Sequence, residues 1–311
     1  MVEYNEVWAP VARHATLRAL LAKCAGKALT LCQLDVETAF LNSVMEEEVY
    51  VRQPAEYERG PHGEVCKLIK ALYGLKQASR AWYKKLVEAL LAGGFRATDA
   101  DPCLFVGTVV GDVCFVLVYV DDLLLASASP KAVGRAKEYI MQTFKSREMG
   151  EPSFFLGMHI ERDLKVGVLR LGQRKYAMDV LARFNMLDAN ATQLPMTVGA
   201  KLQKDGKPLD DEGKLRYQEL VGCLLYLATC TRPDISFAVA RLVRFVSAPT
   251  HAHWAAGKGV MRYLQGTKEL GIEYGGPSDL KAYHDADYAA DVDTRRSTTG
   301  AVFLFNGGAI A

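Results

Sequence analysis

Residues 113–128 read VCFVLVYVDDLLLASA, in which two apolar runs flank a pair of aspartates. Two apolar runs around a two-residue polar turn predict a β-hairpin with Asp121 and Asp122 at its tip. The first run, residues 113–120, is apolar throughout, which is typical of a strand covered on both faces. We therefore expect the two carboxylates to lie at the edge of a hydrophobic core.

The paired carboxylates have two interpretations. A simple turn is the first, because aspartate is a favoured turn residue. The second is a metal site, because unpaired carboxylates repel each other and a divalent cation relieves that repulsion. Asp35 ends another predicted strand, with Glu37 on the same face. Carboxylates from separate strands can hold two metal ions about 3.5–4 Å apart for in-line phosphoryl displacement. The residues alone leave open whether Asp35 meets Asp121.

Apolar periodicity outward from the hairpin predicts the remaining elements. Helices are predicted at residues 16–25, 77–91, 130–144, 173–184, 213–229, 234–247 and 251–265. Strands are predicted at 29–36, 49–51, 103–110, 154–162 and 166–171, and near 272, 281 and 301. Thr16 is a suitable cap for the first helix. Residues 190–211, rich in Pro, Gly, Thr and Asp, are the best linker candidate.

Length and composition limit the class of protein. A chain of 311 residues, half of them hydrophobic, suits two or three domains with a sizeable core. No apolar run approaches the roughly 20 residues that cross a bilayer, so we expect a soluble, intracellular chain. The seven cysteines form no Cys-x-x-Cys pair, which favours reduced thiols. His251 and His253 have no thiol or carboxylate nearby in sequence, which argues against a zinc site.

Charge is unevenly distributed along the chain. Residues 1–60 carry six basic and nine acidic residues, whereas residues 131–185 carry eleven and six. An acidic segment for metals followed by a basic one for phosphates is one interpretation. Chance variation between helix surfaces is the simpler one.

Several short motifs occur in a fixed order. They are LDVETAF at 34–40, LYGLKQASRAW at 72–82, YVDD at 119–122, ADPCLF at 100–105, FLG at 155–157, QRKY at 173–176, TRPD at 231–234, HDAD at 284–287 and STTG at 297–300. Together they closely resemble the landmarks of reverse transcriptases from copia-type long-terminal-repeat retrotransposons. The similarity covers essentially the whole chain, and the order of the motifs makes it specific.

The resemblance implies roles for the residues of the first motifs. Asp35 and Asp121 would hold two Mg²⁺ ions, or possible Mn²⁺ substitutes, with Asp122 as a more structural third ligand. Phe40 matches the steric gate that excludes a ribose 2′-hydroxyl, although core packing is an alternative. Ala39 would offer its backbone N–H to the triphosphate.

Further roles follow from the later motifs. Tyr73, Gly74 and Lys76 match the motif that lies over the incoming nucleotide and template, although Lys76 taken alone is better explained as a solvated lysine at a helix start. The primer grip matches Phe155, Leu156 and Gly157. The thumb-like helix would contact nucleic-acid backbone phosphates through Arg174, Lys175 and Arg183. A solvated helix face explains those three charges almost as well.

The resemblance also implies an α+β architecture in four parts. Residues 1–128 would form the polymerase palm, with the fingers largely missing, and 129–195 the palm end, primer grip and thumb-like region. Residues 196–277 would be a linker and helical connection. Residues 278–311 would begin an RNase H-like segment, in which Asp285 is a vestigial metal ligand.

The implied function is RNA-directed DNA polymerisation. The partners are then an RNA or DNA template with its primer, deoxynucleotides, and the rest of the Pol polyprotein, in a cytoplasmic virus-like particle or the nucleus. Because both ends look shortened, we expect weak or absent activity. The alternatives are an inactive retroelement remnant that at most binds nucleic acid, and a palm-fold nucleotide cyclase, which the motifs disfavour.

Overall fold

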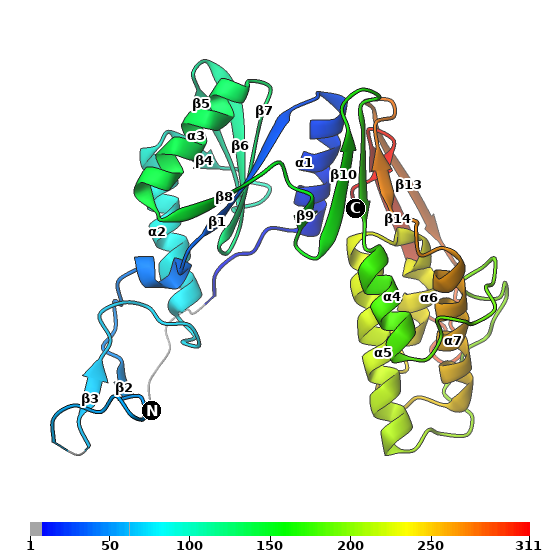
Figure 1. The fold of residues 1–311 in the computed structure, drawn as a ribbon. Helices are drawn as coiled ribbons and strands as arrows, with labels where there is room; N and C mark the ends of the chain where they lie inside the picture. Colours follow the sequence, from blue (N-terminus) through cyan, green and yellow to red (C-terminus); the bar gives the residue numbers. More distant parts are fainter. Residues whose placement is uncertain (1–7, 62) are drawn as a thin grey trace. The chain divides into compact units, whose positions relative to one another are not determined.

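The structure is a computed structural model that describes residues 8–61 and 63–311. Residues 1–7 of the predicted palm lie outside the described residues. The chain divides into two compact units, one of residues 8–17 and 27–152 and the other of residues 18–26 and 153–311. Each unit combines helices with antiparallel strands, as predicted for an α+β chain (Figure 1).

The first unit is built on a six-stranded antiparallel sheet in the order β4-β5-β6-β7-β1-β8. Its strands are β1 (Thr30–Val36), β4 (Phe95–Ala97), β5 (Leu104–Val109), β6 (Asp112–Tyr119), β7 (Asp122–Ser127) and β8 (Ser146–Gly150). The predicted hairpin forms β6 and β7 at the centre of the sheet, and residues 123–127 are buried. Continuous apolar sequence is what a strand with both faces covered requires.

Two helices, α2 (Ala78–Ala92) and α3 (Pro130–Thr143), pack against each other beside this sheet (Figure 1). The Tyr139 hydroxyl of α3 donates a hydrogen bond to the Ala89 carbonyl of α2, at 2.7 Å. The buried residues of α2 are spaced four apart, which places them on one helical stripe. They are Ala78, Trp82, Leu86 and Leu90.

Two smaller elements follow β1 in the first unit. The 3₁₀ turn η1 (Ala39–Asn42) comes directly after it, and β2 (Tyr50–Arg52) pairs with β3 (Val65–Lys67). Strand β8 was not predicted from the sequence, because Ser-Arg-Glu-Met-Gly contains only one large apolar residue. As an edge strand it pairs only with β1, so it needs no apolar alternation of its own.

Helix α1 (His14–Gly26) begins two residues earlier than predicted. The Thr16 hydroxyl donates to Asp101 Oδ2 at 2.6 Å, and the Arg13 backbone N–H donates to the same oxygen at 3.0 Å. The prediction that Thr16 caps this helix is therefore wrong. A carboxylate distant in sequence satisfies the start of the helix instead.

The second unit contains a sheet in the order β12-β11-β10-β9. Its strands are β9 (Phe154–Phe155), β10 (Met158–Asp163), β11 (Val168–Gly172) and β12 (Ile272–Tyr274). The strand predicted at 154–162 is broken by a turn at Leu156 and Gly157, whose φ angles are 49° and 77°. Two positive φ values are the requirement of a tight type I′ hairpin turn.

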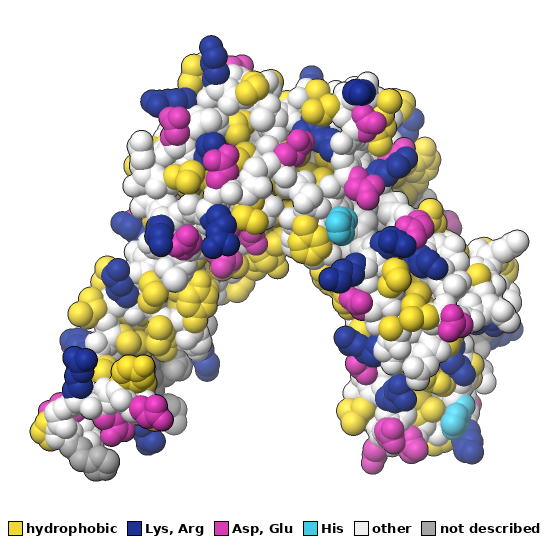
Figure 2. All heavy atoms as spheres, viewed as in Figure 1, with side chains coloured by type: hydrophobic (Ala, Val, Ile, Leu, Met, Phe, Trp, Pro, Cys, Tyr) yellow, Lys and Arg dark blue, Asp and Glu magenta, His cyan; other side chains and the backbone are white. Residues whose placement is uncertain are grey.

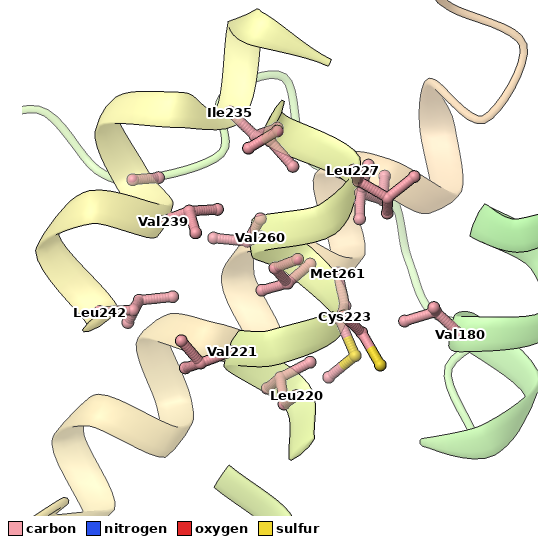
Figure 3. Packing of buried hydrophobic residues seen from close by; sticks show 14 of the residues in the cluster. Val180, Leu220, Val221, Cys223, Leu227, Ile235, Val239, Leu242, Val260 and Met261 are labelled. Carbon is pink, nitrogen blue, oxygen red and sulfur yellow. The ribbon is translucent and has the colours of Figure 1, made fainter. Parts of the chain in front are cut away.

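A helical core fills the rest of the second unit. Its helices are α4 (Arg174–Arg183), α5 (Asp211–Cys230), α6 (Ser236–Val243) and α7 (His251–Gly266), with η2 (Pro233–Ile235) before α6. Apolar side chains of α5, α6 and α7 meet in this core (Figure 3). These helices confirm the predictions, except that the helix predicted at 234–247 ends at Val243.

The remaining elements close the description of the second unit. Strands β13 (Leu280–Ala286), β14 (Thr299–Phe305) and β15 (Gly308–Ala309) form a three-stranded antiparallel sheet. His253 Nδ1 accepts a hydrogen bond from the Thr250 backbone N–H and completes the capping box of α7. Among the described residues, none of the helices has the length and apolar character needed to cross a membrane.

Candidate active site

The site begins at the turn between β6 and β7. Tyr119 pairs with Asp122, so the two turn residues are Val120 and Asp121 and not Asp121 and Asp122 as predicted. Asp122 is the first residue of β7, because its backbone pairs with both β6 and β1. Val120 adopts a φ of 58°, at the position where a type II′ hairpin turn normally has glycine. A β-branched residue in this region is strained by roughly 1–3 kcal/mol and persists only where its surroundings hold it.

The structure brings Asp35 directly beside this turn. Strand β1 pairs with β7 in a register that places Asp35 opposite Asp122. The Val36 backbone N–H also donates to the Asp121 carbonyl oxygen, at 2.9 Å. Directly opposed residues project from the same face of a sheet, so the Asp35 and Asp122 carboxylates share one face.

That face is the one turned away from α3. Cys32 lies on the other face of β1, where burial and then the Glu148 carboxylate raise the pKa of its thiol, opposed by Lys137 of α3. Strand alternation puts Gln33 and Asp35 on the face opposite Cys32. The carboxylates are therefore not covered by this helix.

The electrostatics of the cluster are those of neighbouring like charges. Burial raises the pKa of Asp122, a hydrogen bond from Gln33 Nε2 at 3.2 Å opposes this, and the carboxylates of Asp121 and Asp35 raise it further. Within residues 8–61 and 63–311, no ion pair joins any of the three aspartates to a cation. The like-charge repulsion among them is therefore not offset by a salt bridge in this part of the chain.

Three carboxylates fit Mg²⁺ in their chemistry, because this ion prefers oxygen ligands. Burial is the main cause of the raised pKa of Asp122, and the carboxylates of Asp121 and Asp35 add to it; a dication would offset the contribution of these like charges. The side chains do not already form a closed metal cage, since no group of three His, Cys, Asp or Glu side chains in the described part of the chain is arranged to hold an ion.

Phe40 and Tyr73 lie next to the carboxylates. Their ring centroids are 4.4 Å apart with planes tilted by 37°. Burial and then the Asp121 carboxylate raise the pKa of Tyr73, hydrogen bonding to the Ala39 backbone opposes this, and Asp35 contributes in the same sense as Asp121. The Tyr73 hydroxyl is thus close to both predicted metal ligands. The next residue, Gly74, adopts a φ of 97° that favours glycine.

Sequence reasoning missed three contributors to the site. Gln33 holds Asp122, and its position two residues before Asp35 was the signal that both share a face. Arg147 of β8 pairs in register with Asp35, on a strand that the sequence did not predict. Trp82 belongs to the helix predicted at 77–91 and was given no role of its own, but its indole N–H donates to the Val120 carbonyl oxygen at 2.7 Å.

The predicted primer-grip residues form the tight turn between β9 and β10 in the second unit. Phe155 is buried, and the Leu156 carbonyl accepts a hydrogen bond from the Tyr226 hydroxyl at 3.1 Å. A Cβ at Gly157 would collide with that hydroxyl. Glycine is therefore required here by space as well as by its positive φ.

The predicted backbone-contacting cations differ in their partners. Arg174 forms an ion pair with Glu269 at 2.6 Å and Arg183 one with Glu219 at 3.0 Å. Lys175 is exposed and has no ion-pair partner among the described residues. Asp285 is exposed on β13, opposite Gly300 of β14.

Comparison with known proteins identifies the class of this chain. The family model for reverse transcriptase (RNA-dependent DNA polymerase) matches residues 1–198. Because this match covers more than half of the sequence, the chain belongs to the reverse transcriptase family.

Its relatives are Pol polyproteins of copia-type transposons. The chain is 38% identical over its full length to the retrovirus-related Pol polyprotein from transposon TNT 1-94 of Nicotiana tabacum, covering 24% of that protein. It is 40% identical, over 96% of its length, to the Pol polyprotein from transposon RE2 of Arabidopsis thaliana, covering 20% of it. A putative transposon Ty5-1 protein of Saccharomyces cerevisiae is 34% identical, with 88% of the chain and 89% of the relative aligned. The chain thus spans a quarter or less of the two plant polyproteins.

Proposed function

We propose that this chain carries the nucleotidyl-transfer site of an RNA-directed DNA polymerase. The observation that supports the proposal is the register of β1 with β7, which sets Asp35 opposite Asp122, the residue that follows the Val120–Asp121 turn. Residues 87 positions apart in the sequence are thereby combined into one acidic site. A structural turn alone would not need a third carboxylate on the neighbouring strand.

The proposed ligands of two Mg²⁺ ions are Asp35 and Asp121, with Asp122 as a third. When bound, such ions stabilise the attacking and leaving oxygens of an in-line displacement at phosphorus. The reaction is attack of the primer 3′-hydroxyl on the α-phosphate of a deoxynucleotide, which releases pyrophosphate. Gln33 keeps Asp122 oriented through the hydrogen bond to Oδ1, and Mn²⁺ has the same ligand preference for oxygen.

We assign the Phe40–Tyr73 ring pair to the sugar side of the nucleotide. Phe40 follows Ala39 at the start of η1 and is only partly buried, so its ring is not simply a core residue. The contact with Tyr73 restricts the positions open to the Phe40 ring. A fixed ring at this place would exclude a 2′-hydroxyl and favour deoxynucleotides. Gly74 and Lys76 continue the same segment toward the template.

The partner that fits the proposal is a primer–template duplex, bound in part by Arg174, Lys175 and Arg183 and positioned by the 155–157 turn. On the face shown in Figure 2, Lys and Arg side chains are interspersed with Asp and Glu rather than gathered into one patch. Nucleic-acid affinity should therefore come from a few placed cations and not from bulk charge. The rest of a Pol polyprotein is the expected covalent context.

Primer extension on an RNA template with Mg²⁺ tests the proposal. Asp121→Asn removes one negative charge while keeping the size of the side chain, and we expect extension to fall about 10³-fold, which corresponds to ~4 kcal/mol of transition-state stabilisation. Asp112→Asn is the matched control, because Asp112 begins β6 at the end of the strand away from the Val120–Asp121 turn. Equal extension by all three proteins would contradict the assignment of Asp121.

Metal binding gives a second readout that does not need turnover. A ligand that binds only the folded state raises the unfolding free energy in proportion to the logarithm of its concentration. We expect Mg²⁺ to raise the melting temperature of the chain and of Asp112→Asn, but not of Asp35→Asn or Asp121→Asn. Metal binding without extension would favour the alternative of an inactive remnant. If Mg²⁺ still stabilises both Asp35→Asn and Asp121→Asn, the proposed metal site is wrong.

A further inference from the structure

Both carbonyl groups of the Val120–Asp121 turn are held by hydrogen bonds from outside the hairpin. The Asp121 carbonyl accepts from the Val36 backbone N–H at 2.9 Å, on the strand that carries Asp35. The Val120 carbonyl accepts from Trp82 Nε1 at 2.7 Å, from helix α2. The turn is therefore fixed by β1 and also by the helical layer.

The hydrogen bond from Trp82 is accepted by Val120, the turn residue whose backbone conformation is strained. Val120 has a φ of 58°, which is an unfavourable conformation for a β-branched residue. Such a conformation persists only where the surrounding structure holds it. The orientation of the following peptide sets the direction in which the Asp121 side chain projects. Loss of the constraint on Val120 should consequently move the Asp121 carboxylate away from Asp35.

Trp82 itself is rigidly placed. Its side chain is 1% exposed, and its ring meets Phe144 edge-on with centroids 5.0 Å apart. Trp82 also belongs to the buried stripe of α2, together with Leu86 and Leu90. A donor fixed in this way can hold a turn without losing side-chain entropy of its own.

Packing alone does not hold the turn from behind. An apolar cavity of about 150 Å³ borders Trp82, Val118 and Val120 and extends to Ala9 and Pro10. Side chains that border a cavity lack van der Waals partners on that side. The indole–carbonyl hydrogen bond is therefore the directional contact between α2 and the turn.

From these contacts we infer that Trp82 is a positioning residue, whose indole N–H holds the Val120–Asp121 turn so that the Asp121 carboxylate faces Asp35. The inference rests on the proposed metal site and adds to it a residue outside the carboxylate cluster. Replacing a residue that orients a metal ligand commonly lowers metal affinity or activity by roughly 10–100-fold.

Trp82→Phe is the decisive variant, because it removes the N–H donor and keeps an aromatic ring, although a smaller one, in the core. Tyr139→Phe is the matched control. It removes the hydrogen bond from the Tyr139 hydroxyl to the Ala89 carbonyl, which at 2.7 Å has the same length as the bond from Trp82 to Val120. The Tyr139 bond joins two helices and lies away from the turn. Three measurements compare them: the melting temperature without metal, the affinity for Mn²⁺, and kcat and KM in primer extension.

Without metal we expect Trp82→Phe to lose more stability than Tyr139→Phe, because the smaller ring also leaves a gap in the core. Only Trp82→Phe should weaken Mn²⁺ binding by about 10-fold or more and lower kcat with little change in KM for the deoxynucleotide. Amide exchange at residues 120–123 should also rise in this variant alone. If Trp82→Phe lowers the melting temperature but leaves Mn²⁺ affinity and amide exchange at the level of Tyr139→Phe, Trp82 is only structural and the inference is overturned.

Asp121→Asn separates this outcome from failure of the proposed function. Mn²⁺ binding that is lost in Asp121→Asn but kept in Trp82→Phe overturns the role of Trp82 alone. Mn²⁺ binding that is unaffected by Asp121→Asn overturns the metal site, and the role of Trp82 with it.

Discussion

Two aspartate-containing motifs of this chain, YVDD at 119–122 and TRPD at 231–234, differ sharply in how their carboxylates are compensated. Asp121 and Asp122 of the first unit have each other and Asp35 as neighbours, and the pKa of Asp122 is raised by burial and by these like charges. Asp234 of the second unit forms an ion pair with Arg232 at 2.7 Å. One motif concentrates negative charge, and the other neutralises it.

The surroundings of Arg232 make this difference clearer. Its side chain is only 2% exposed, and its guanidinium also donates to the Thr267 carbonyl at 2.9 Å and the Thr267 hydroxyl at 2.7 Å. The Tyr263 hydroxyl donates to Asp234 at 2.9 Å. The charged side chains of the motif, Arg232 and Asp234, thus both have hydrogen-bond partners within the second unit. A fully satisfied network indicates a structural role, whereas an uncompensated cluster indicates a site for a cation.

The largest effect on stability should come from Asp234→Asn. This change leaves the buried Arg232 without its counter-charge, and breaking such a pair costs about 3 kcal/mol. Urea unfolding measures the loss. Asp188→Asn, at an exposed position of the same unit, is the control and should change the unfolding free energy by less than about 0.5 kcal/mol. A loss below about 1 kcal/mol at Asp234 would contradict the comparison.

The same pair has a defined pH dependence. Burial acts to raise the pKa of Asp234, but hydrogen bonds and charge from Arg232, together with the Tyr263 hydroxyl, lower it below the ordinary value of 3.8. A lowered pKa contributes stability that is present above the unfolded value and is lost as the pH falls through the folded one. The difference between the unmodified protein and Asp234→Asn should therefore shrink only under strongly acidic conditions.

Asp122→Asn should change the unfolding free energy in the opposite direction and by a smaller amount. The folded pKa of Asp122 is raised above 3.8, first by burial, so its carboxyl contributes stability at low pH that is lost as the pH rises through the raised value. In metal-free buffer at neutral pH the variant should be more stable, by less than about 1 kcal/mol. Asparagine keeps an oxygen acceptor for Gln33, so the hydrogen bond is retained.

Unfolding curves between acidic and neutral pH test this expectation. The two proteins should converge at low pH and separate as the pH rises, with the separation reversed when Mg²⁺ is added, because only the unmodified protein keeps all three carboxylates. A variant that is less stable than the unmodified protein at neutral pH without metal would show that the acidic cluster is already compensated.

The sequence predicted the two motifs with unequal completeness. The β6–β7 hairpin follows from local pattern, because its apolar runs and its two-residue turn are adjacent. The pairing of β1 with β7 does not, because residues 30–36 and 122–127 are far apart and no local signal sets their register. Only the family resemblance suggested that Asp35 meets Asp121.

Edge strands and side-chain donors were the main omissions. Strand β8 lacks apolar alternation, so periodicity could not reveal it or place Arg147 opposite Asp35. Trp82 was predicted as a buried helix residue, but the target of its N–H depends on tertiary structure. The roles assigned to the primer grip and Asp285, and the division at 128, 195 and 277, stay predictions.

The smallest expected effect concerns the basic side chains of α4, which also differ in whether they are paired. Lys175 is exposed on α4 and borders a cavity of about 790 Å³, without an ion pair in the described part of the chain, whereas Arg183 of the same helix is paired with Glu219. An unpaired cation releases a full counterion equivalent when it binds a phosphate, so Lys175→Ala should reduce the salt slope of primer–template binding by about 1.

Arg183→Ala should change that slope less, because Glu219 already offsets the charge of Arg183 at 3.0 Å. Both changes should alter stability by less than about 0.5 kcal/mol, since exposed ion pairs contribute little. Fluorescence anisotropy with a labelled RNA–DNA duplex over a series of salt concentrations gives both slopes. A larger slope change in Arg183→Ala than in Lys175→Ala would mean that nucleic acid displaces Glu219 from its arginine, and that pairing in the free protein does not distinguish structural from functional charges on this helix.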